Sequence, residues 1–378
     1  MKFTINKKIL LQNLNNVSRA LSNKNLIPIL SGIKFELTMK GLILSASDND
    51  IYIEIFISKK DINIEKEGKA VIQGKYILEI IRKVEDELVS IELLDNIKLN
   101  IKCGNANFNL NCMDYSDFPN LKIKENKKPI FININDLKNL VYKTSFAVSL
   151  QETRPVLTGI NFKTNGKKIE CVSTDSYRLA KKEIILNDKI EEDVNLIIPG
   201  KNFIEFIKIL ENEDINNINK NVEVYIDSNQ VLFIYDNINF QTRILSGSFP
   251  DISRLIPKNK EIKIELNNID FYNVIDRASL LTSEREKNII NFKTIGDHAI
   301  ISSNTPEIGK VEEKINIIKE QKEKNIDISF SSKFMLEALK VIESKEVILE
   351  FINDIQPIII KDKNDENYIQ LILPIKTY

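Results

Sequence analysis

The chain has 378 residues, of which 43% are hydrophobic and 28% are charged, as in a soluble globular protein of two or three domains. The net charge of −1 gives no overall basic excess that would indicate a nucleic-acid partner. Cys103, Cys112 and Cys171 show no C-x-x-C spacing, which argues against a disulfide framework or a zinc site. The opening Met-Lys-Phe-Thr runs directly into a strand pattern, and no apolar run approaches membrane-spanning length, so we expect a cytoplasmic protein.

In chain order, the first pattern is a short strand followed by an amphipathic helix, and it occurs three times about 125 residues apart. The three copies lie at residues 3–21, 131–146 and 264–281. Each is followed by alternating strands, which begin with Gly32–Glu36, Gly159–Lys163 and Ile289–Lys293. The chain is therefore expected to contain three related domains.

Each copy repeats the strand-and-helix pattern at its middle, at residues 70–84, 196–210 and 326–342. Helical spacing is clear at Phe203, Phe206, Ile207 and Leu210, and Ser331 or Ser332 is the expected N-cap of the last helix. Strands with period-two alternation follow, for example at residues 222–226, 230–235 and 239–245.

These patterns predict six β-α-β-β-β units, two per domain, in an α+β architecture of three repeated two-layer domains. The predicted domains are residues 1–124, 129–252 and 260–378. Charged, proline-containing joints separate them at Lys122–Pro129 and Pro257–Glu261, and Ile315–Lys324 is expected to be a solvated segment.

No group of residues is suited to acid, base and nucleophile work together, so the sequence argues against an enzyme. There is no phosphate-binding glycine loop, and the single histidine, His298, is interpreted as a hairpin turn residue. Asp48 and Asp50 are expected in a turn, with a metal-binding pair as the alternative, and Asp362–Glu366 is expected to be a polar hairpin tip. We expect no cofactor and no metal.

The stretch Cys171–Ala180 carries an unusual turn. Thr174, Asp175 and Ser176 favour a turn, and Tyr177, Arg178 and Leu179 follow at once, so the turn could border an apolar pocket. An ordinary β-turn is the alternative interpretation. The corresponding turns at residues 47–50 and 303–305 lack the Tyr-Arg-Leu triplet, which favours a partner-binding role for the middle copy.

The predicted helices are basic although the chain is neutral. The windows 7–21, 75–84, 136–147, 201–210, 270–281 and 332–342 carry 13 basic and 6 acidic residues, a net charge of +7. Helices on one side of a curved sheet could therefore present a positive wall to a phosphate backbone without reading its sequence. Solubility of exposed helix faces is the alternative explanation.

Several segments, taken together in order, resemble the bacterial DNA polymerase III beta subunit, the sliding clamp, over essentially the full chain. They are Met1–Ile5, Leu26–Leu30, Asp114–Asn120, Ser173–Ala180, Ser248–Asp251 and Leu373–Lys376. The resemblance implies the DNA clamp fold and a head-to-tail homodimer that closes into a ring. It also implies a function: the ring encircles duplex DNA, slides on it, and tethers the replicative polymerase. The expected partners are double-stranded DNA, the polymerase, the clamp loader and other proteins with clamp-binding peptides, with no membrane.

By the same resemblance, a peptide-binding pocket lies between the second and third domains and takes Leu or Phe side chains of short extended peptides. Its implied residues are Leu157, Thr174, Ser176, Tyr177, Arg178, Leu179, Pro250, Arg254, Leu255, Phe334, Leu371, Leu373, Pro374 and Ile375. Two guanidinium groups, of Arg178 and Arg254, would rim this cleft. Ser176 and Tyr177 replace a Gly-His pair of some family members, and Phe334 stands where others have a tyrosine.

The resemblance also implies DNA contacts at Lys24, Gln151, Arg154 and Lys201. The ring interface would pair Ile77, Ile80, Ile81, Phe108 and Leu110 of the first domain with Arg277, Leu280, Leu281 and acidic Glu307, Glu312 and Glu313 of the third. Asn105 and Asn107 stand where arginines are frequent, so closure would depend more on apolar contact. A clamp-fold scaffold or inhibitor that binds proteins without encircling DNA is the alternative function.

Overall fold

The computed structural model describes residues 1–21, 27–95, 97–120, 128–211, 220–257, 261–283, 288–306, 308–321 and 325–376. These residues form two compact units. Unit 1 comprises Met1–Ile134 and Glu205–Ile244, and unit 2 comprises Asn135–Ile204 and Leu245–Tyr378. The chain passes from one unit to the other after Ile134, within helix α4 (Gly200–Glu211), and after Ile244. The two predicted joints between domains lie mostly outside the described residues; they are Lys122–Pro129 and Pro257–Glu261.

Unit 1 is built on one antiparallel sheet, which contains 13 strands among the described residues. Its order is β10-β15-β16-β17-β4-β3-β2-β6-β9-β8-β7-β1-β5, and the first and middle repeats join where β17 pairs with β4. The strands are β1 (Lys2–Asn6), β2 (Gly32–Thr38), β3 (Gly41–Ser47), β4 (Ile51–Ser58), β5 (Ile62–Lys66), β6 (Gly68–Gln73), β7 (Leu88–Leu94), β8 (Lys98–Cys103), β9 (Ala106–Met113), β10 (Ile130–Asn133), β15 (Asn221–Ile226), β16 (Gln230–Tyr235) and β17 (Ile238–Arg243).

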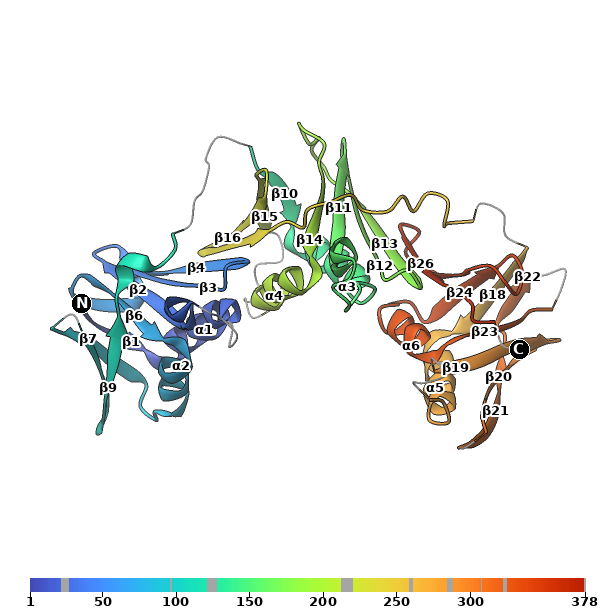
Figure 1. Ribbon diagram of the computed structural model, residues 1–378, viewed down its shortest axis with the longest axis horizontal. Coiled ribbons are helices and arrows are strands. Elements are labelled where there is room, and N and C mark those ends of the chain that lie inside the picture. The colour runs from blue at the N-terminus through green and yellow to red at the C-terminus, as the bar shows by residue number, and fades with distance from the viewer. Residues whose placement is uncertain are drawn as a thin grey trace. The chain divides into compact units, whose positions relative to one another are not determined.

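Helices α1 (Lys7–Val17) and α2 (Gly74–Lys83) of unit 1 cover the strands of the first repeat (Figure 1). Their buried apolar positions, such as Leu10, Leu14, Ile77 and Ile81, recur with helical spacing. The second half of α4 packs in the same way, and the Phe206 ring lies 4.8 Å from the ring of Phe233. Unit 1 is thus a two-layer α+β structure.

Unit 2 contains two sheets among its described residues. The larger has the order β14-β11-β12-β13-β26-β25-β24-β18-β22, and the smaller has the order β21-β20-β19-β23. The strands are β11 (Gly159–Asn165), β12 (Lys168–Thr174), β13 (Arg178–Ile185), β14 (Asn195–Pro199), β18 (Ile262–Asn267), β19 (Ile289–Ile295), β20 (His298–Thr305), β21 (Gly309–Asn316), β22 (Lys319–Gln321), β23 (Asp327–Ser331), β24 (Glu346–Phe351), β25 (Ile358–Asp362) and β26 (Tyr368–Ile372).

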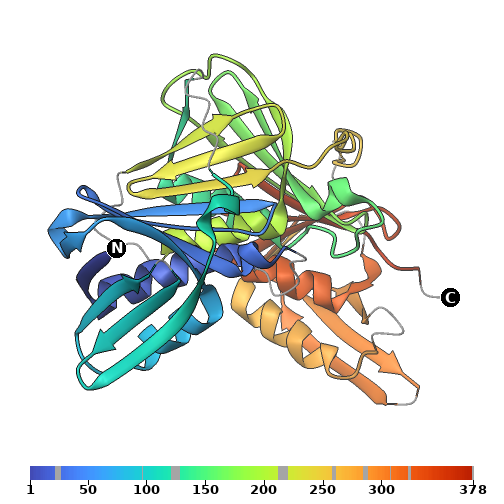
Figure 2. The ribbon, with the colours of Figure 1, turned by 60° about the vertical axis from the view of Figure 1, so that its left-hand side comes forward.

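The pairing of β13 with β26 joins the middle repeat to the third within unit 2. Helix α3 (Ile134–Ser145) belongs to the middle repeat, and α5 (Asn268–Ser279) and α6 (Ser332–Lys340) lie side by side in the third (Figures 1 and 2). The aromatic core of the third repeat stacks Phe292 on Phe351, with ring centroids 5.9 Å apart.

The strand-and-helix pattern of the sequence is confirmed in all three copies and at the middle of each. One detail differs. Ser331 occupies the N-cap of α6, but its side chain makes no capping hydrogen bond. Also, β22 lies in a stretch that we expected to be solvated, because Lys319–Gln321 pairs with the edge of β18.

Candidate functional site

The turn between β12 and β13 is fixed by its own side chains. One carboxylate oxygen of Asp175 accepts hydrogen bonds from the backbone N–H groups of Tyr177 and Arg178, at 2.9 and 3.0 Å. The Thr174 hydroxyl donates to the Arg178 carbonyl at 2.6 Å, and Ser176 has a left-handed φ of 79°. The predicted turn is therefore confirmed, and it leaves the Tyr177 side chain 60% exposed.

Arg178 is buried, with 8% of its surface exposed, although we expected it on the rim of a cleft. Its guanidinium donates to Asp175 at 3.0 Å, to the Phe146 carbonyl at 2.6 Å, and to a carboxylate oxygen of Glu337 on α6. The group also lies 4.5 Å from the centre of the Phe334 ring. Arg178 therefore ties the turn to α6, and of the two expected rim guanidiniums only Arg254 is exposed.

The end of the chain is held beside this turn. Strand β26 pairs with β13, so that Leu371 lies opposite Leu179 and Ile372 lies opposite Arg178. Beyond the strand, the Leu373 N–H donates to the Tyr177 carbonyl at 2.9 Å, and the Ile375 N–H donates to the Ser329 carbonyl at 2.7 Å. Residues 371–375 are thus fixed next to the turn.

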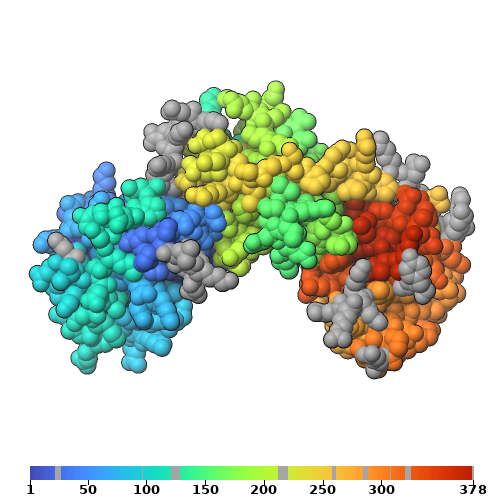
Figure 3. Space-filling view, in the orientation of Figure 1, coloured from blue at the N-terminus to red at the C-terminus, as the bar shows by residue number. Residues whose placement is uncertain are grey.

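A small apolar cluster lies under the same strands. Val172, Leu179, Ile359 and Leu371 are buried in it, and Phe249, Ile252 and Ile256 pack against it. The last three belong to the segment 245–257, which runs over the surface of unit 2 against the C-terminal strands, in gold in Figure 3. That segment also presents the exposed side chains of Pro250, Arg254 and Leu255.

The residues expected to form a peptide pocket all belong to unit 2, and they divide by exposure. The buried members are Leu157, Thr174, Arg178, Leu179 and Leu371. The half-buried members are Phe334, Pro374 and Ile375, and the exposed members are Ser176, Tyr177, Pro250, Arg254, Leu255 and Leu373. Exposed apolar side chains beside a rigid backbone, such as Tyr177, Leu255 and Leu373, can bury apolar side chains of another chain.

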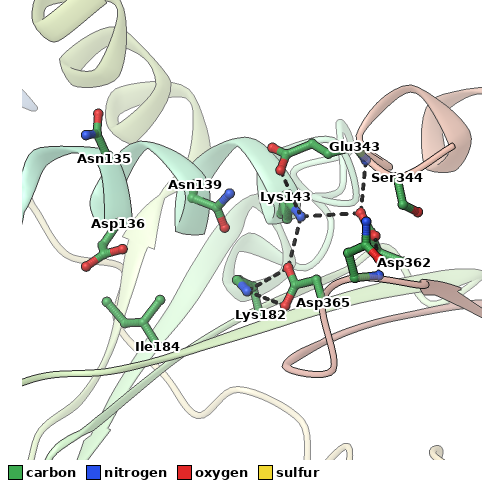
Figure 4. Close-up of a pocket in the computed structure, with 11 residues that line it drawn as sticks. Asn135, Asp136, Asn139, Lys143, Lys182, Ile184, Glu343, Ser344, Asp362 and Asp365 are labelled. Carbon is green, nitrogen blue, oxygen red and sulfur yellow. Dashed lines mark hydrogen bonds and ion pairs between the residues drawn. The ribbon is translucent and has the colours of Figure 1, made fainter.

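A second feature of unit 2 was not foreseen from the sequence. A polar cavity of about 440 Å³ opens between α3, β13 and the hairpin of β25 and β26 (Figure 4). It is lined by Asn135, Asp136, Asn139, Lys143, Lys182, Ile184, Glu343, Ser344, Asp362, Asn364 and Asp365.

The ammonium groups of this cavity are neutralised within it. Lys143 is 1% exposed, and its Nζ lies 2.9 Å from Asp365 and 3.7 Å from Asp362. Lys182 Nζ lies 2.6 Å from Asp365. Burial of the Asp365 carboxyl raises its pKa, but hydrogen bonds from Lys182 and Lys143 outweigh burial, so the pKa lies below the ordinary 3.8. The cavity is therefore an internal ion-pair cluster rather than an acid-base site.

The sequence does hold a signal for this cluster. Lys143 is a charged residue on the apolar stripe of α3, between the buried Leu140 and Ala147, and such a lysine requires a buried partner. The hairpin tip 362–366 was predicted as a turn, and the structure confirms a hairpin there, but Asp362 and Asp365 also bind lysines of the middle repeat.

The side chains that were considered for chemistry lie in a turn or directly beside one. Asp48 accepts hydrogen bonds from the backbone N–H groups of Asp50 and Ile51, at 3.1 and 2.8 Å. His298 is the first residue of β20 and pairs with Ile295, so it flanks the hairpin turn that we expected it to occupy, and its Nδ1 lies 3.0 Å from Asp297. Among the described residues, no group of three or more His, Cys, Asp or Glu side chains could hold a metal ion. In the same residues, no helix is long and apolar enough to cross a membrane.

The residues expected to contact DNA are exposed where they are described. Gln151 and Arg154 lie in the loop before β11, and Lys201 lies in the first turn of α4. Lys24 lies outside the described residues.

The residues expected at a ring interface differ in exposure. Leu280 is 75% exposed, whereas Ile77 and Ile81 are wholly buried in unit 1 and can only support an interface from behind. Ile80, Phe108, Leu110 and Leu281 are half-buried. Arg277 is exposed and makes an ion pair with Glu313 at 2.6 Å, while Glu307 lies outside the described residues.

Three family models cover almost the whole chain. They describe the N-terminal, central and C-terminal domains of the DNA polymerase III beta subunit, and they match residues 1–122, 131–251 and 253–376. The chain belongs to the DNA polymerase III beta-subunit family, the sliding clamps. Its repeated α+β domains are therefore three clamp domains.

Individual relatives agree with this family. The beta sliding clamps of Staphylococcus epidermidis and Staphylococcus aureus are 40% and 39% identical to this chain, each over 100% of both chains. The crystal structure of the DNA polymerase sliding clamp from Bacillus subtilis is 40% identical and superposes with a TM-score of 0.94 over 100% of both chains. The beta chain of DNA polymerase III from Streptococcus pneumoniae, at 31% identity, also gives 0.94 over both full chains. The function supported by these relatives is that of a DNA sliding clamp.

Proposed function

We propose that this clamp is a head-to-tail homodimer that closes into a ring around duplex DNA and slides along it without reading its sequence. The ring would tether the replicative polymerase and be placed on DNA by a clamp loader. The observation that carries the proposal is the match of three successive clamp domains over almost the full chain. We place the domains at residues 1–124, 129–252 and 260–378, so that two chains bring six domains around the duplex.

The clamp would act in the cytoplasm by topology, without a catalytic step and without a cofactor. Attraction to phosphates suits such a ring because it holds DNA at any sequence. Exposed Gln151, Arg154 and Lys201 support a role for these residues in DNA contact, and we assign Lys24 to the same group by the family resemblance.

We further propose that partners bind at the surface formed by the β12–β13 turn, the 245–257 segment and the chain end, here called the peptide site. The exposed Tyr177, Leu255 and Leu373 would receive Leu and Phe side chains of an extended peptide. Each buried anchor contributes about 1.5–3 kcal/mol before the cost of ordering the peptide.

The peptide site is tested by fluorescence polarisation with a short labelled peptide carrying Leu and Phe. Because it removes apolar contact area, Leu373→Ala should weaken binding by about tenfold or more, equivalent to about 1.4 kcal/mol. Ile185→Ala is the matched control, since Ile185 is 71% exposed and lies at the opposite end of β13 from Arg178. Equal affinity of the Leu373→Ala variant and the wild type would contradict this placement of the site.

A further inference from the structure

In the ion pairs between the middle and third repeats of unit 2, the middle repeat supplies the cations and the third repeat supplies the carboxylates. The cations are Lys143, Arg178 and Lys182, from α3 and β13 of the middle repeat. The buried or half-buried carboxylates that they meet across the contact are Glu337, Asp362 and Asp365, from α6 and the β25–β26 hairpin. Lys143 also lies 3.8 Å from the exposed Glu343. We call the three cations and the first three carboxylates the ionic seam.

The seam is deeply buried on its cationic side. Lys143, Arg178 and Lys182 are 1%, 8% and 9% exposed, so each ammonium or guanidinium has lost most of its water. Charges in that position are tolerated only when they are paired, and a carboxylate partner is therefore held firmly in place. The seam fixes α6 and the hairpin against β13.

The seam and the peptide site share strand β13, and both involve the β25–β26 hairpin. Successive side chains of a strand point to opposite faces, so Arg178 and Lys182 lie on one face of β13 and Leu179 lies on the other. Leu179 belongs to the apolar cluster under the peptide site, and Leu371 lies opposite it on β26. Any shift of the hairpin or of β13 at the seam would therefore move Leu179 and Leu371, which lie in the apolar cluster under the peptide site.

Helix α6 connects the seam to the peptide site a second time. Glu337 binds Arg178, and Phe334, one turn earlier on the helix, is stacked at 4.5 Å on the same guanidinium. Phe334 is half-buried and is one of the expected peptide-site residues. The orientation of its ring is thus determined by a cation that is itself held by Glu337 and Asp175.

We infer that Glu337 and Asp365 are positioning residues of the peptide site. They touch no peptide, but they hold Phe334 of α6 and the strands β13 and β26 at the spacing that binding requires. This inference rests on the proposed peptide site. It assigns a binding role to Glu337 and Asp365, which the family resemblance did not select. It also makes Arg178 a buried residue that holds α6 and β13 together rather than a residue at the rim of the cleft.

The experiment compares Glu337→Gln and Asp365→Asn with Glu205→Gln. Glu205 makes an ion pair with Arg19 at 2.7 Å in unit 1, and it has 19% side-chain exposure compared with 32% for Glu337, so its variant controls for the loss of a partly buried Arg–Glu pair. Because the chain has no tryptophan, Tyr177→Trp gives one fluorescence reporter at the peptide site. Tyr177 is a proposed peptide contact, so seam variants in this background are compared with Tyr177→Trp alone and not with the wild type. Peptide affinity is measured by polarisation in both backgrounds, well below the unfolding temperature of each variant.

We expect Glu337→Gln and Asp365→Asn to bind the peptide about tenfold more weakly and to shift the emission of the tryptophan reporter, while Glu205→Gln does neither. Glu337→Asp keeps the charge and should restore most of the affinity, which a role in stability alone would not require. If the wild type binds no peptide, the proposed peptide site fails. If the wild type binds and both seam variants match Glu205→Gln per folded molecule, the inference is overturned and the proposed site stands.

Discussion

At the residue scale, the main finding is how unit 2 uses buried charge. Lys143 and Arg178 sit in positions where a hydrophobic side chain would ordinarily be found, and each is paired with carboxylates more than 150 residues away in sequence. A buried pair contributes little compared with a well-packed apolar pair, but removing one partner leaves an uncompensated charge.

Asp365→Asn should therefore destabilise the protein strongly. The substitution leaves two buried ammonium groups, of Lys143 and Lys182, without their nearest carboxylate, and a loss of about 3–5 kcal/mol is expected. Chemical denaturation followed by circular dichroism measures it. Asp327 pairs with Lys293 at 3.0 Å and both side chains are about half exposed, so Asp327→Asn is the matched control and should cost about 1 kcal/mol or less. Similar losses in the free energy of unfolding for the two variants would contradict a special stabilising role of the Asp365 ion pairs.

The same carboxylate predicts a pH dependence. Because the native pKa of Asp365 lies below the ordinary 3.8, its contribution is fully present above that value and is lost as the pH falls through the native pKa. The stability difference between wild type and Asp365→Asn should be constant near neutral pH and should narrow below about pH 4. A difference that widens on acidification would contradict the assigned ion pairs.

Individual side chains were only partly predictable from the sequence. The turn at Thr174–Ser176 follows from local chemistry, since its side chains bond to backbone groups a few residues away. The burial of Arg178 does not, because its partner Glu337 is brought near only by the pairing of β13 with β26. The prediction that Arg178 lies at the rim of the cleft was wrong for that reason.

At the element scale, helix caps show where local rules hold. The Asn267 side chain accepts a hydrogen bond from the Asp270 N–H at 3.0 Å and caps α5, whereas Ser331 at the start of α6 makes no such bond. Both helices nevertheless begin where the sequence pattern places them, since the spacing of apolar residues decides which turns are buried.

Asn267→Ala should destabilise the protein by about 1 kcal/mol, because it removes the acceptor for one unpaired N–H of α5. Ser331→Ala is the matched substitution at α6 and should change the stability by less than about half that amount. Thermal unfolding of both variants beside the wild type gives the comparison. A greater loss for Ser331→Ala would show that its hydroxyl has a role that the cap geometry does not reveal.

Strand β22 marks the limit of prediction for elements. Lys319–Gln321 has neither alternation nor β-branched residues, and nothing in it indicates a strand. It becomes one because β18 offers an open edge, to which Lys319 and Gln321 pair opposite Glu265 and Lys263. Long-range pairing, rather than local preference, determined this element.

At the scale of the whole molecule, the threefold repeat was readable from the sequence, and the comparisons confirm three clamp domains. The continuity of the sheets was not readable. Pairing of β17 with β4 and of β13 with β26 joins neighbouring repeats edge to edge, so that the described residues form two compact units. Such pairing protects strand edges that would otherwise be exposed.

The proposed dimer makes a prediction at this scale. Leu280, which is 75% exposed at the end of α5, would be covered by the partner, so Leu280→Asp should weaken dimerisation by about tenfold or more. Ile269→Asp is the control, since Ile269 is 66% exposed near the start of the same helix. Sedimentation over a concentration series measures both, and equal dimer stability of the Leu280→Asp variant and the wild type would remove Leu280 from the interface.

The most direct test of the account is retention on circular DNA. The protein is loaded onto nicked circular duplex by a clamp loader, freed of unbound protein by gel filtration at high salt, and divided before one half is linearised. A ring that encircles DNA should stay on the closed circle and leave the linear molecule from its ends, because high salt suppresses simple phosphate binding. Equal retention on circular and linear DNA, or no retention on either, would contradict a sliding clamp and support a clamp-fold protein that binds partners without encircling DNA.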